Sequence, residues 1–170
     1  MGEKFLYLIA SFDHTTTNKF KEIEENLNEI GIFGNQTPNI PHHITLGKYT
    51  IDREVEIRLL LSDVCSRTEK FDVNFSSIGM FGEDILFLKP EMSKALIGLH
   101  DSFDKGFIKE HLEWVPHATL LIDDAEVVQT AIPIVEQNFT QILGSIESVS
   151  LYEIFPASLI KKCSLKRNLI

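Results

Sequence analysis

Residues 40–47 read IPHHITLG, and residues 115–121 read VPHATLL. Each stretch places a histidine and a threonine two positions apart, with a leucine after them and a proline shortly before. Side chains two residues apart on a β-strand point to the same face, so each stretch predicts a strand that presents an imidazole beside a hydroxyl. A proline fits the start of a strand, where a missing N–H costs little. The residues that recur are His43, Thr45, His117 and Thr119.

The two motifs lie 74 residues apart, and the same offset brings other patterns into register. After the first motif, apolar residues at i, i+3, i+4 and i+7 predict an amphipathic helix. Its counterpart after the second motif contains Pro133, which disfavours a helix in its first half because an internal proline removes a backbone hydrogen bond. The predicted helices are 20–31, 52–67, 92–103 and 126–141, and the predicted strands beside the motifs are 4–12, 71–79, 84–90, 145–153 and 158–164.

This doubled order of elements predicts an α+β fold. We expect residues 1–170 to form one domain of two lobes related by a pseudo-twofold axis. Each lobe would be an antiparallel sheet with flanking helices, and the two motif strands would face each other across a cleft between the lobes.

The composition narrows the class of protein. The chain has 170 residues, is 44% hydrophobic and carries a formal net charge of −9. It can bury an ordinary globular core, and its apolar runs are too short for a membrane span. The N-terminus lacks the basic-then-apolar order of a signal peptide, so we expect a cytoplasmic monomer that binds no membrane. Tight binding of long nucleic acid needs a basic face and is not expected. Cys65 and Cys163 lack a C-x-x-C pattern and predict free thiols.

The motif residues suit proton transfer at a phosphate. Two imidazoles with an ordinary pKa of about 6.5 can divide the work near neutral pH, one as base and one as acid. Two threonine hydroxyls can donate to the non-bridging oxygens of a phosphate. No acidic residue adjoins either motif histidine, so the pattern predicts phosphoryl chemistry without a metal, and no cofactor is expected.

The paired tetrads HITL at 43–46 and HATL at 117–120 resemble the signature of the 2H phosphoesterase superfamily. This superfamily includes the bacterial 2′-5′ RNA ligase-like proteins and cyclic nucleotide phosphodiesterases. Two other segments are similar to the family as well, namely IGMFGEDILFL at 78–88 and IESVSLYE at 146–153. The resemblance therefore extends over nearly the whole chain.

The resemblance implies that His43 and His117 form a catalytic pair and that Thr45 and Thr119 bind phosphate. It implies His43 as proton donor and His117 as acceptor, although the residues alone leave this order open because the site is pseudo-symmetric. The implied reaction opens a 2′,3′-cyclic phosphate or cleaves a 2′-5′ linkage, and some members run it in reverse as ligases.

The residues that follow the tetrads depart from the ligase-like pattern. Relatives of that type often carry an aromatic-Leu-Gly run after the first tetrad and a basic residue after the second. Here residues 47–49 read GKY and residues 121–123 read LID. These departures favour a small nucleotide, a nucleotide-sugar cyclic phosphate or a short RNA over a substrate of tRNA size.

Five further side chains are candidates for substrate contact. His14 lies where a helix is about to begin, so a capping or solvated role is the default, but it also follows the opening strand, whose end can reach the cleft. Phe81 and Trp114 can stack on a base, or can pack in the core as aromatic residues more often do. Lys48 and Tyr152 can reach a phosphate, or can serve solubility and packing.

The other histidines predict no site. His42 must point to the opposite strand face from His43, and we expect His100 and His111 to be solvated on or near a helix. Two other classes of function stay open: a nucleotide-binding module that has lost turnover, and a structural interaction domain, which would gain nothing from the polar tetrads. Turnover that depends on His43 would separate an enzyme from a binding module.

Overall fold

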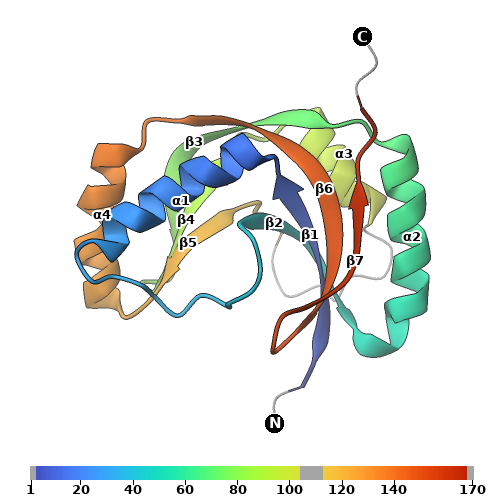
Figure 1. Ribbon diagram of the computed structural model, residues 1–170, viewed down its shortest axis with the longest axis horizontal. Coiled ribbons are helices and arrows are strands. Elements are labelled where there is room, and N and C mark those ends of the chain that lie inside the picture. The colour runs from blue at the N-terminus through green and yellow to red at the C-terminus, as the bar shows by residue number, and fades with distance from the viewer. Residues whose placement is uncertain (1–2, 104–112, 168–170) are drawn as a thin grey trace.

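The structure is a computed structural model that describes residues 3–103 and 113–167 (Figure 1). Both halves of the chain run strand, helix, strand, helix, strand, as the doubled pattern predicts. The elements are β1 (Phe5–Phe12), α1 (His14–Asn28), β2 (His43–Thr50), a 3-10 turn (Ile51–Arg53), α2 (Glu54–Arg67), β3 (Phe71–Phe81), β4 (Ile85–Pro90), α3 (Lys94–Ser102), β5 (Ala118–Ile122), α4 (Ala125–Asn138), β6 (Ile142–Ile154) and β7 (Ser158–Ser164).

Within the described residues, seven strands form one sheet in the order β2-β1-β6-β3-β4-β5, with β7 also paired to β6. All of these strand pairs are antiparallel, which confirms the α+β class. The order reads the same from both ends when β2 is matched with β5 and β1 with β4. A single sheet carries both halves, because β6 pairs with β3 through residues 142–146 and with β1 through residues 146–154.

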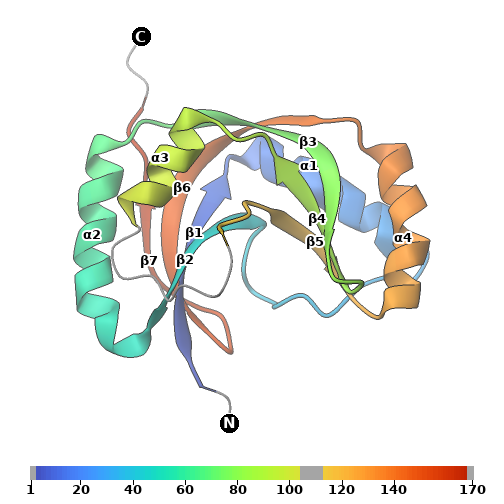
Figure 2. The ribbon, with the colours of Figure 1, turned by 180° about the vertical axis from the view of Figure 1, so that it is seen from behind.

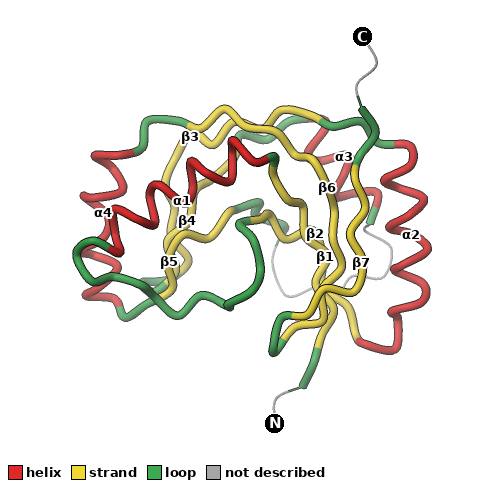
Figure 3. Tube along the Cα trace, in the orientation of Figure 1, coloured by secondary structure: helices red, strands yellow, loops and turns green. Residues whose placement is uncertain are grey.

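The strand order also crosses the two halves of the sequence. β6, from the second half, pairs with β1, while β3, from the first half, pairs with β4. We call β2, β1, β7 and the C-terminal part of β6 the β1 arm, and β3, β4 and β5 the β4 arm. Figure 3 shows α1 and α4 at the β4 arm and α2 and α3 at the β1 arm.

The main core lies between the sheet and the four helices. Alternate residues of β1, such as Leu6 and Leu8, are fully buried and pack in one cluster with apolar residues from every helix. Ile9 points to the other face, where it forms a small separate cluster with Tyr152 and Ile154. We call this second face the motif face, because His43 and Thr45 share it with Ile9 by strand register.

Two helix boundaries differ from the sequence prediction. α1 begins at His14, earlier than predicted, because the Asp13 carboxylate accepts a hydrogen bond from the Thr16 N–H at 2.9 Å and caps the helix. It also ends before Ile30, which is exposed. α4 runs through Pro133, whose disfavoured position is offset by three buried residues on the same helix, namely Val128, Ala131 and Val135.

Cys65 is buried, Cys163 is half-buried, and both are free thiols, as predicted. Burial raises the pKa of the Cys65 thiol to about 12, so it stays protonated near neutral pH. None of the described helices is both long and apolar enough to cross a lipid bilayer.

Candidate active site

The two motif strands lie at opposite edges of the sheet, yet the sheet curves so that they approach each other (Figures 1 and 2). Trp114, three residues before His117, donates its indole N–H to the carbonyl oxygen of Thr45 at 3.0 Å. This hydrogen bond links the segment before the second motif directly to the first motif. His43 and His117 are close enough that charge on His117 affects the pKa of His43.

The two histidine rings are held in the same way. The Nδ1 atom of His43 lies 2.7 Å from the carbonyl oxygen of Pro41, and the Nδ1 atom of His117 lies 2.8 Å from the carbonyl oxygen of Val115. A carbonyl oxygen can only accept, so Nδ1 carries the hydrogen in both rings. The Nε2 atom of each ring is therefore the nitrogen left to take up or release a proton.

A β-bulge occupies the fourth position of each tetrad. Thr45 pairs with Ile9 of β1, and Gly47 pairs with Leu8, so Leu46 is an extra residue between the two pairs. The β4–β5 ladder shifts in the same way, which makes Leu120 the extra residue of the second motif. Both leucines are 1% exposed. The leucine that ends each tetrad therefore anchors a bulge in the core, and bulges of this kind re-aim the residues beside them.

The first bulge changes which residues share a face with His43. Strict alternation along β2 would send Lys48 to the core and Tyr49 to the motif face. With the bulge, Lys48 pairs with Tyr7 on the motif face, while Tyr49 is fully buried and donates its hydroxyl to the Phe103 carbonyl at 2.8 Å. The structure therefore brings Lys48, a predicted contact, to the same face as the motif.

Burial shifts both motif histidines toward their neutral forms. It lowers the pKa of His43 to about 4, and positive charge on His117 and His42 acts in the same direction, against the hydrogen bond to Pro41. Burial also lowers the pKa of His117, while its hydrogen bond to Val115 raises it. In the free protein both imidazoles are neutral near pH 7, and each Nε2 atom holds a lone pair.

Two phenylalanines pack against His117. The ring centroid of Phe81 lies 4.6 Å from that of His117 at an interplanar angle of 86°, and the ring of Phe87 lies at 5.2 Å. Gly79 is the cross-strand partner of Phe87, and a Cβ atom there would come within 2.5 Å of the Phe87 ring. The absence of a side chain at Gly79 thus makes room for the ring that supports His117.

Gly79→Ala is expected to lower the free energy of unfolding by about 1–3 kcal/mol, because the added methyl group displaces the Phe87 ring. The His117 ring packs against the Phe87 ring, so this displacement should also shift the pKa of His117. Thermal unfolding and the NMR titration of the His117 ring measure the two effects. Gly98→Ala is the matched control, because a Cβ atom at Gly98 meets nothing within 4 Å. In this variant the free energy of unfolding should not fall, and the pKa of His117 should not shift. Equal behaviour of the two variants would contradict the role of Gly79.

The other predicted contacts divide into two groups. Lys48, Phe81 and Tyr152 lie near the motif: Phe81 contacts His117, and Tyr152, only 8% exposed, shares the motif-face cluster with Ile9. Burial raises the pKa of Tyr152. His14 is exposed on α1 and lies 3.1 Å from Asn18, atom Nε2 to Nδ2, with no contact to a motif residue among the described residues.

Trp114 is held by packing. Its ring is stacked on the ring of His100, with centroids 3.9 Å apart and planes inclined by 10°. One face of the indole is thus covered by protein, which favours the packing interpretation. The expectation that His100 is solvated was wrong. α3 places the His100 ring against the Trp114 indole, and the His100 side chain is only 14% exposed. His111 lies outside the described residues.

His42 faces away from His43, as predicted. It stacks on Phe20 at 5.1 Å and forms an ion pair with Glu24, both on α1. Sequence reasoning missed Ser11, the cross-strand partner of His43 on β1. Its Oγ atom is buried and has no hydrogen-bond partner among the described residues. Only the strand pairing identifies this residue, since nothing near it in the sequence marks it.

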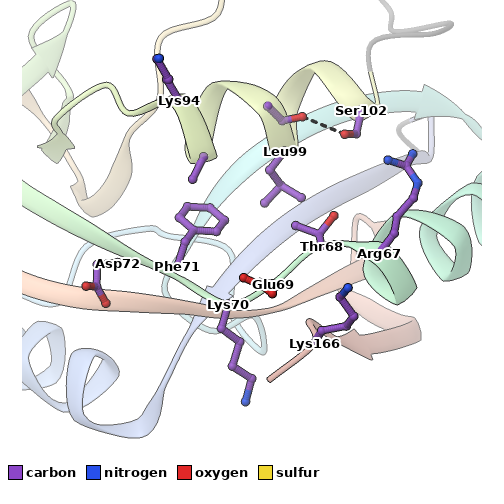
Figure 4. Close-up of a pocket in the computed structure, with 12 residues that line it drawn as sticks. Arg67, Thr68, Glu69, Lys70, Phe71, Asp72, Lys94, Leu99, Ser102 and Lys166 are labelled. Carbon is purple, nitrogen blue, oxygen red and sulfur yellow. Dashed lines mark hydrogen bonds between the residues drawn. The ribbon is translucent and has the colours of Figure 1, made fainter. Parts of the chain in front are cut away.

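A separate cavity of about 670 Å³ lies between α3 and the start of β3 (Figure 4). Phe71 and Leu99 are among the side chains that line it, while the Lys70 side chain points away from them. Two of its cations already have acidic partners: Arg67 pairs with Asp63 and Lys70 with Glu147, each at 3.2 Å. None of the motif residues lines this cavity. Across the described ranges, no three His, Cys, Asp or Glu side chains are placed to hold a metal ion.

The curved sheet brings together two matching motifs whose histidines are held in the same way, and this combination is also found in a protein family. The profile of the 2′-5′ RNA ligase superfamily matches residues 20–154, and the chain belongs to this superfamily. The family-level resemblance seen in the tetrads is thereby confirmed.

Solved structures of low sequence identity share the fold. Escherichia coli LigT, crystallised with NADP+, is 17% identical, with a TM-score of 0.65 and coverage of 96% of this chain and 99% of LigT. The ATP complex of LigT gives a TM-score of 0.62 at 17% identity, covering 97% and 99% of the two chains. A Thermus thermophilus protein gives a TM-score of 0.62 at 12% identity, covering 97% and 100%. No curated protein matches the chain in sequence.

Proposed function

We propose that the protein is a metal-independent phosphodiesterase that opens a 2′,3′-cyclic phosphate or cleaves a 2′-5′ linkage in a small nucleotide or short RNA. The matched Nδ1 hydrogen bonds of His43 and His117 carry this proposal, because they leave an Nε2 atom on each approaching strand for proton transfer. Membership of the 2′-5′ RNA ligase superfamily supports it. So does LigT, which has been solved in complex with NADP+, ATP and 3′-AMP.

In the proposed reaction, one histidine Nε2 takes a proton from water as the water oxygen attacks phosphorus. The bond from phosphorus to a ribose oxygen breaks, and the Nε2–H of the other histidine protonates that oxygen. The hydroxyls of Thr45 and Thr119 donate to the non-bridging oxygens, where negative charge accumulates in the transition state. If a 5′-hydroxyl takes the place of water, its oxygen attacks the phosphorus of a 2′,3′-cyclic phosphate and its proton goes to the first histidine. The ring bond from phosphorus to one ribose oxygen breaks, the second histidine protonates that oxygen, and the product is ligated.

The test is hydrolysis of a panel of nucleoside 2′,3′-cyclic phosphates and 2′-5′ dinucleotides in the presence of EDTA. The proposal requires turnover that the chelator does not change, and chromatography of the product separates 2′-phosphate from 3′-phosphate. Nucleotide binding without turnover would favour the alternative, a binding module that has kept the motif residues. Turnover that EDTA abolishes would contradict the metal-independent mechanism.

The pH dependence of kcat/KM is expected to be bell-shaped, with its maximum on the acid side of neutrality. Burial lowers the pKa of both motif histidines, so the limb on which the required proton is lost lies below the ordinary value of about 6.5. The other limb, where the base becomes protonated, lies near the His43 pKa of about 4. From the sequence alone, both limbs are predicted near neutral pH. Burial lowers the pKa of both histidines and so moves both limbs to lower pH.

Initial rates at low substrate concentration, measured from acid to alkaline pH, give this profile. The bound phosphate is an anion and favours protonated imidazole, so the profile of kcat should lie at higher pH than that of kcat/KM. A kcat/KM maximum on the alkaline side would contradict the assignment of the limbs to these two half-buried rings.

A further inference from the structure

The motif face continues past Thr45 into an aromatic surface on the β1 arm. Tyr7 lies two residues from Ile9 on β1 and pairs with Lys48 on one side and Tyr152 on the other. Its ring meets that of Phe155 edge to face, with centroids 6.5 Å apart and planes at 76°. These side chains extend the cluster around Ile9 toward the turn between β6 and β7.

Phe155 is held outward in an unusual backbone conformation. Its φ is 72°, a region that residues other than glycine rarely occupy and that is costly for a bulky side chain. The side chain is 54% exposed, so burial in the core does not offset this cost. Figure 1 shows the β6–β7 turn projecting below the place where β2 and β5 approach. Residues held in such sparsely populated backbone conformations cluster at active sites, ligand-binding segments and switch regions.

A positive charge lies over the same surface. The Nζ atom of Lys48 is 4.2 Å from the ring centroid of Phe5 and 6.0 Å from that of Tyr7. Lys48 reaches this face only because of the bulge at Leu46. Aromatic rings beside a cation are the usual elements of sites that bind nucleotides without reading their sequence, since rings stack on bases and cations attract phosphates.

The spacing between this surface and the motif fits one nucleotide. Thr45 pairs with Ile9, and Tyr7 lies two residues farther along β1, a distance of about 7 Å at the rise of an antiparallel strand. A phosphate held by Thr45 would therefore have its attached nucleoside within reach of the rings of Tyr7 and Phe155.

We infer that Tyr7, Phe155 and Lys48 form a nucleobase subsite, here called the aromatic shelf. The shelf stacks on the base of the nucleoside joined to the reacting phosphate, and it favours purines, whose larger rings stack more strongly. This inference rests on the proposed function for the position of the phosphate, but binding tests it without any turnover.

The experiment compares the dissociation constants of two probes, adenosine 3′-phosphate and inorganic phosphate, by calorimetry. Tyr7→Leu keeps an apolar side chain in the Ile9 cluster while removing the ring. Phe155→Asn removes the ring with a residue that tolerates positive φ, so the turn is preserved. Each variant should weaken adenosine 3′-phosphate binding about tenfold, as expected for the loss of one stacking contact, and leave phosphate binding unchanged.

Leu143→Asn is the matched control, because Leu143 is an exposed apolar residue at the opposite end of β6. It should change neither dissociation constant. An equal loss of affinity for both probes, unchanged affinity for adenosine 3′-phosphate in the shelf variants, or no nucleotide binding by the wild type would each overturn the shelf. Failure of the proposed function looks different: the wild type would bind the nucleotide, lose affinity in the shelf variants and hydrolyse none of the cyclic phosphates.

Discussion

Replacing His43 or His117 by alanine is expected to lower kcat/KM for a nucleoside 2′,3′-cyclic phosphate by roughly 10²–10⁴-fold. Each substitution removes an Nε2 atom that the Nδ1 hydrogen bond has oriented, so proton transfer to or from the reacting oxygens is lost. The double variant should be little slower than either single variant, because residues that act as one unit are strongly non-additive. Steady-state rates in EDTA provide the measurement.

His42→Gln is the control for the first motif. His42 is the next residue along the chain, yet its ring lies against Phe20 and Glu24 on the helix side of the sheet. The variant should keep turnover close to that of the wild type, although its thermal unfolding temperature is expected to fall. A loss in His42→Gln as large as that in His43→Ala, or wild-type rates in both alanine variants, would contradict the two-histidine mechanism.

The same variants determine which histidine is the acid. A diester whose leaving group departs as a stable anion, such as bis(p-nitrophenyl) phosphate, does not need a proton donor, so the variant that lacks the acid should regain most of its rate. The lowered pKa of His43 favours a neutral base at this position, which predicts recovery in His117→Ala. The resemblance implies the reverse order and predicts recovery in His43→Ala.

The sequence predicts the elements and the motif face well, because both depend on local pattern. Alternation places His43 with Thr45, and buried Ile44 behind them, as the structure has it. The order of the strands could not be predicted from the sequence. Nothing in the repeat indicates that β6 pairs with β1 and β3 with β4, because strand pairing depends on contacts between residues distant in sequence. The two motif bulges are equally hidden, because an apolar leucine fits a regular strand as readily as a bulge.

The environment of the two motif histidines could not be predicted from the sequence either, for a different reason. The pKa of His43 is set mainly by burial, which no local pattern measures. Gly79 on β3 and Phe87 on the adjacent strand β4 are cross-strand partners, and Gly79 leaves room for the Phe87 ring that packs against His117. In the sequence both look like ordinary strand residues. Trp114 illustrates the same limit, since stacking on a base and stacking on His100 are equally consistent with its position before the motif.

Thr45→Val and Thr119→Val are expected to lower kcat by roughly 10²-fold each, the usual cost of removing one donor to a developing oxyanion. Valine keeps the shape of threonine but replaces the hydroxyl by a methyl group, and both positions are half-buried strand residues that tolerate a β-branched side chain. The loss should fall on kcat more than on KM, because the hydroxyls are proposed to hold charge that is greatest in the transition state.

Thr45→Ser and Thr119→Ser separate the hydroxyl from the rest of the side chain. Serine retains the donor and loses only a methyl group, so the serine variants should keep kcat within about tenfold of the wild type, well above the valine variants. For Thr45 the comparison also controls for the backbone, since the carbonyl that accepts from Trp114 is present in every variant. Equal losses in the valine and serine variants would assign these residues to packing. Selective loss in valine would place both hydroxyls at the phosphate, one from each arm of the sheet.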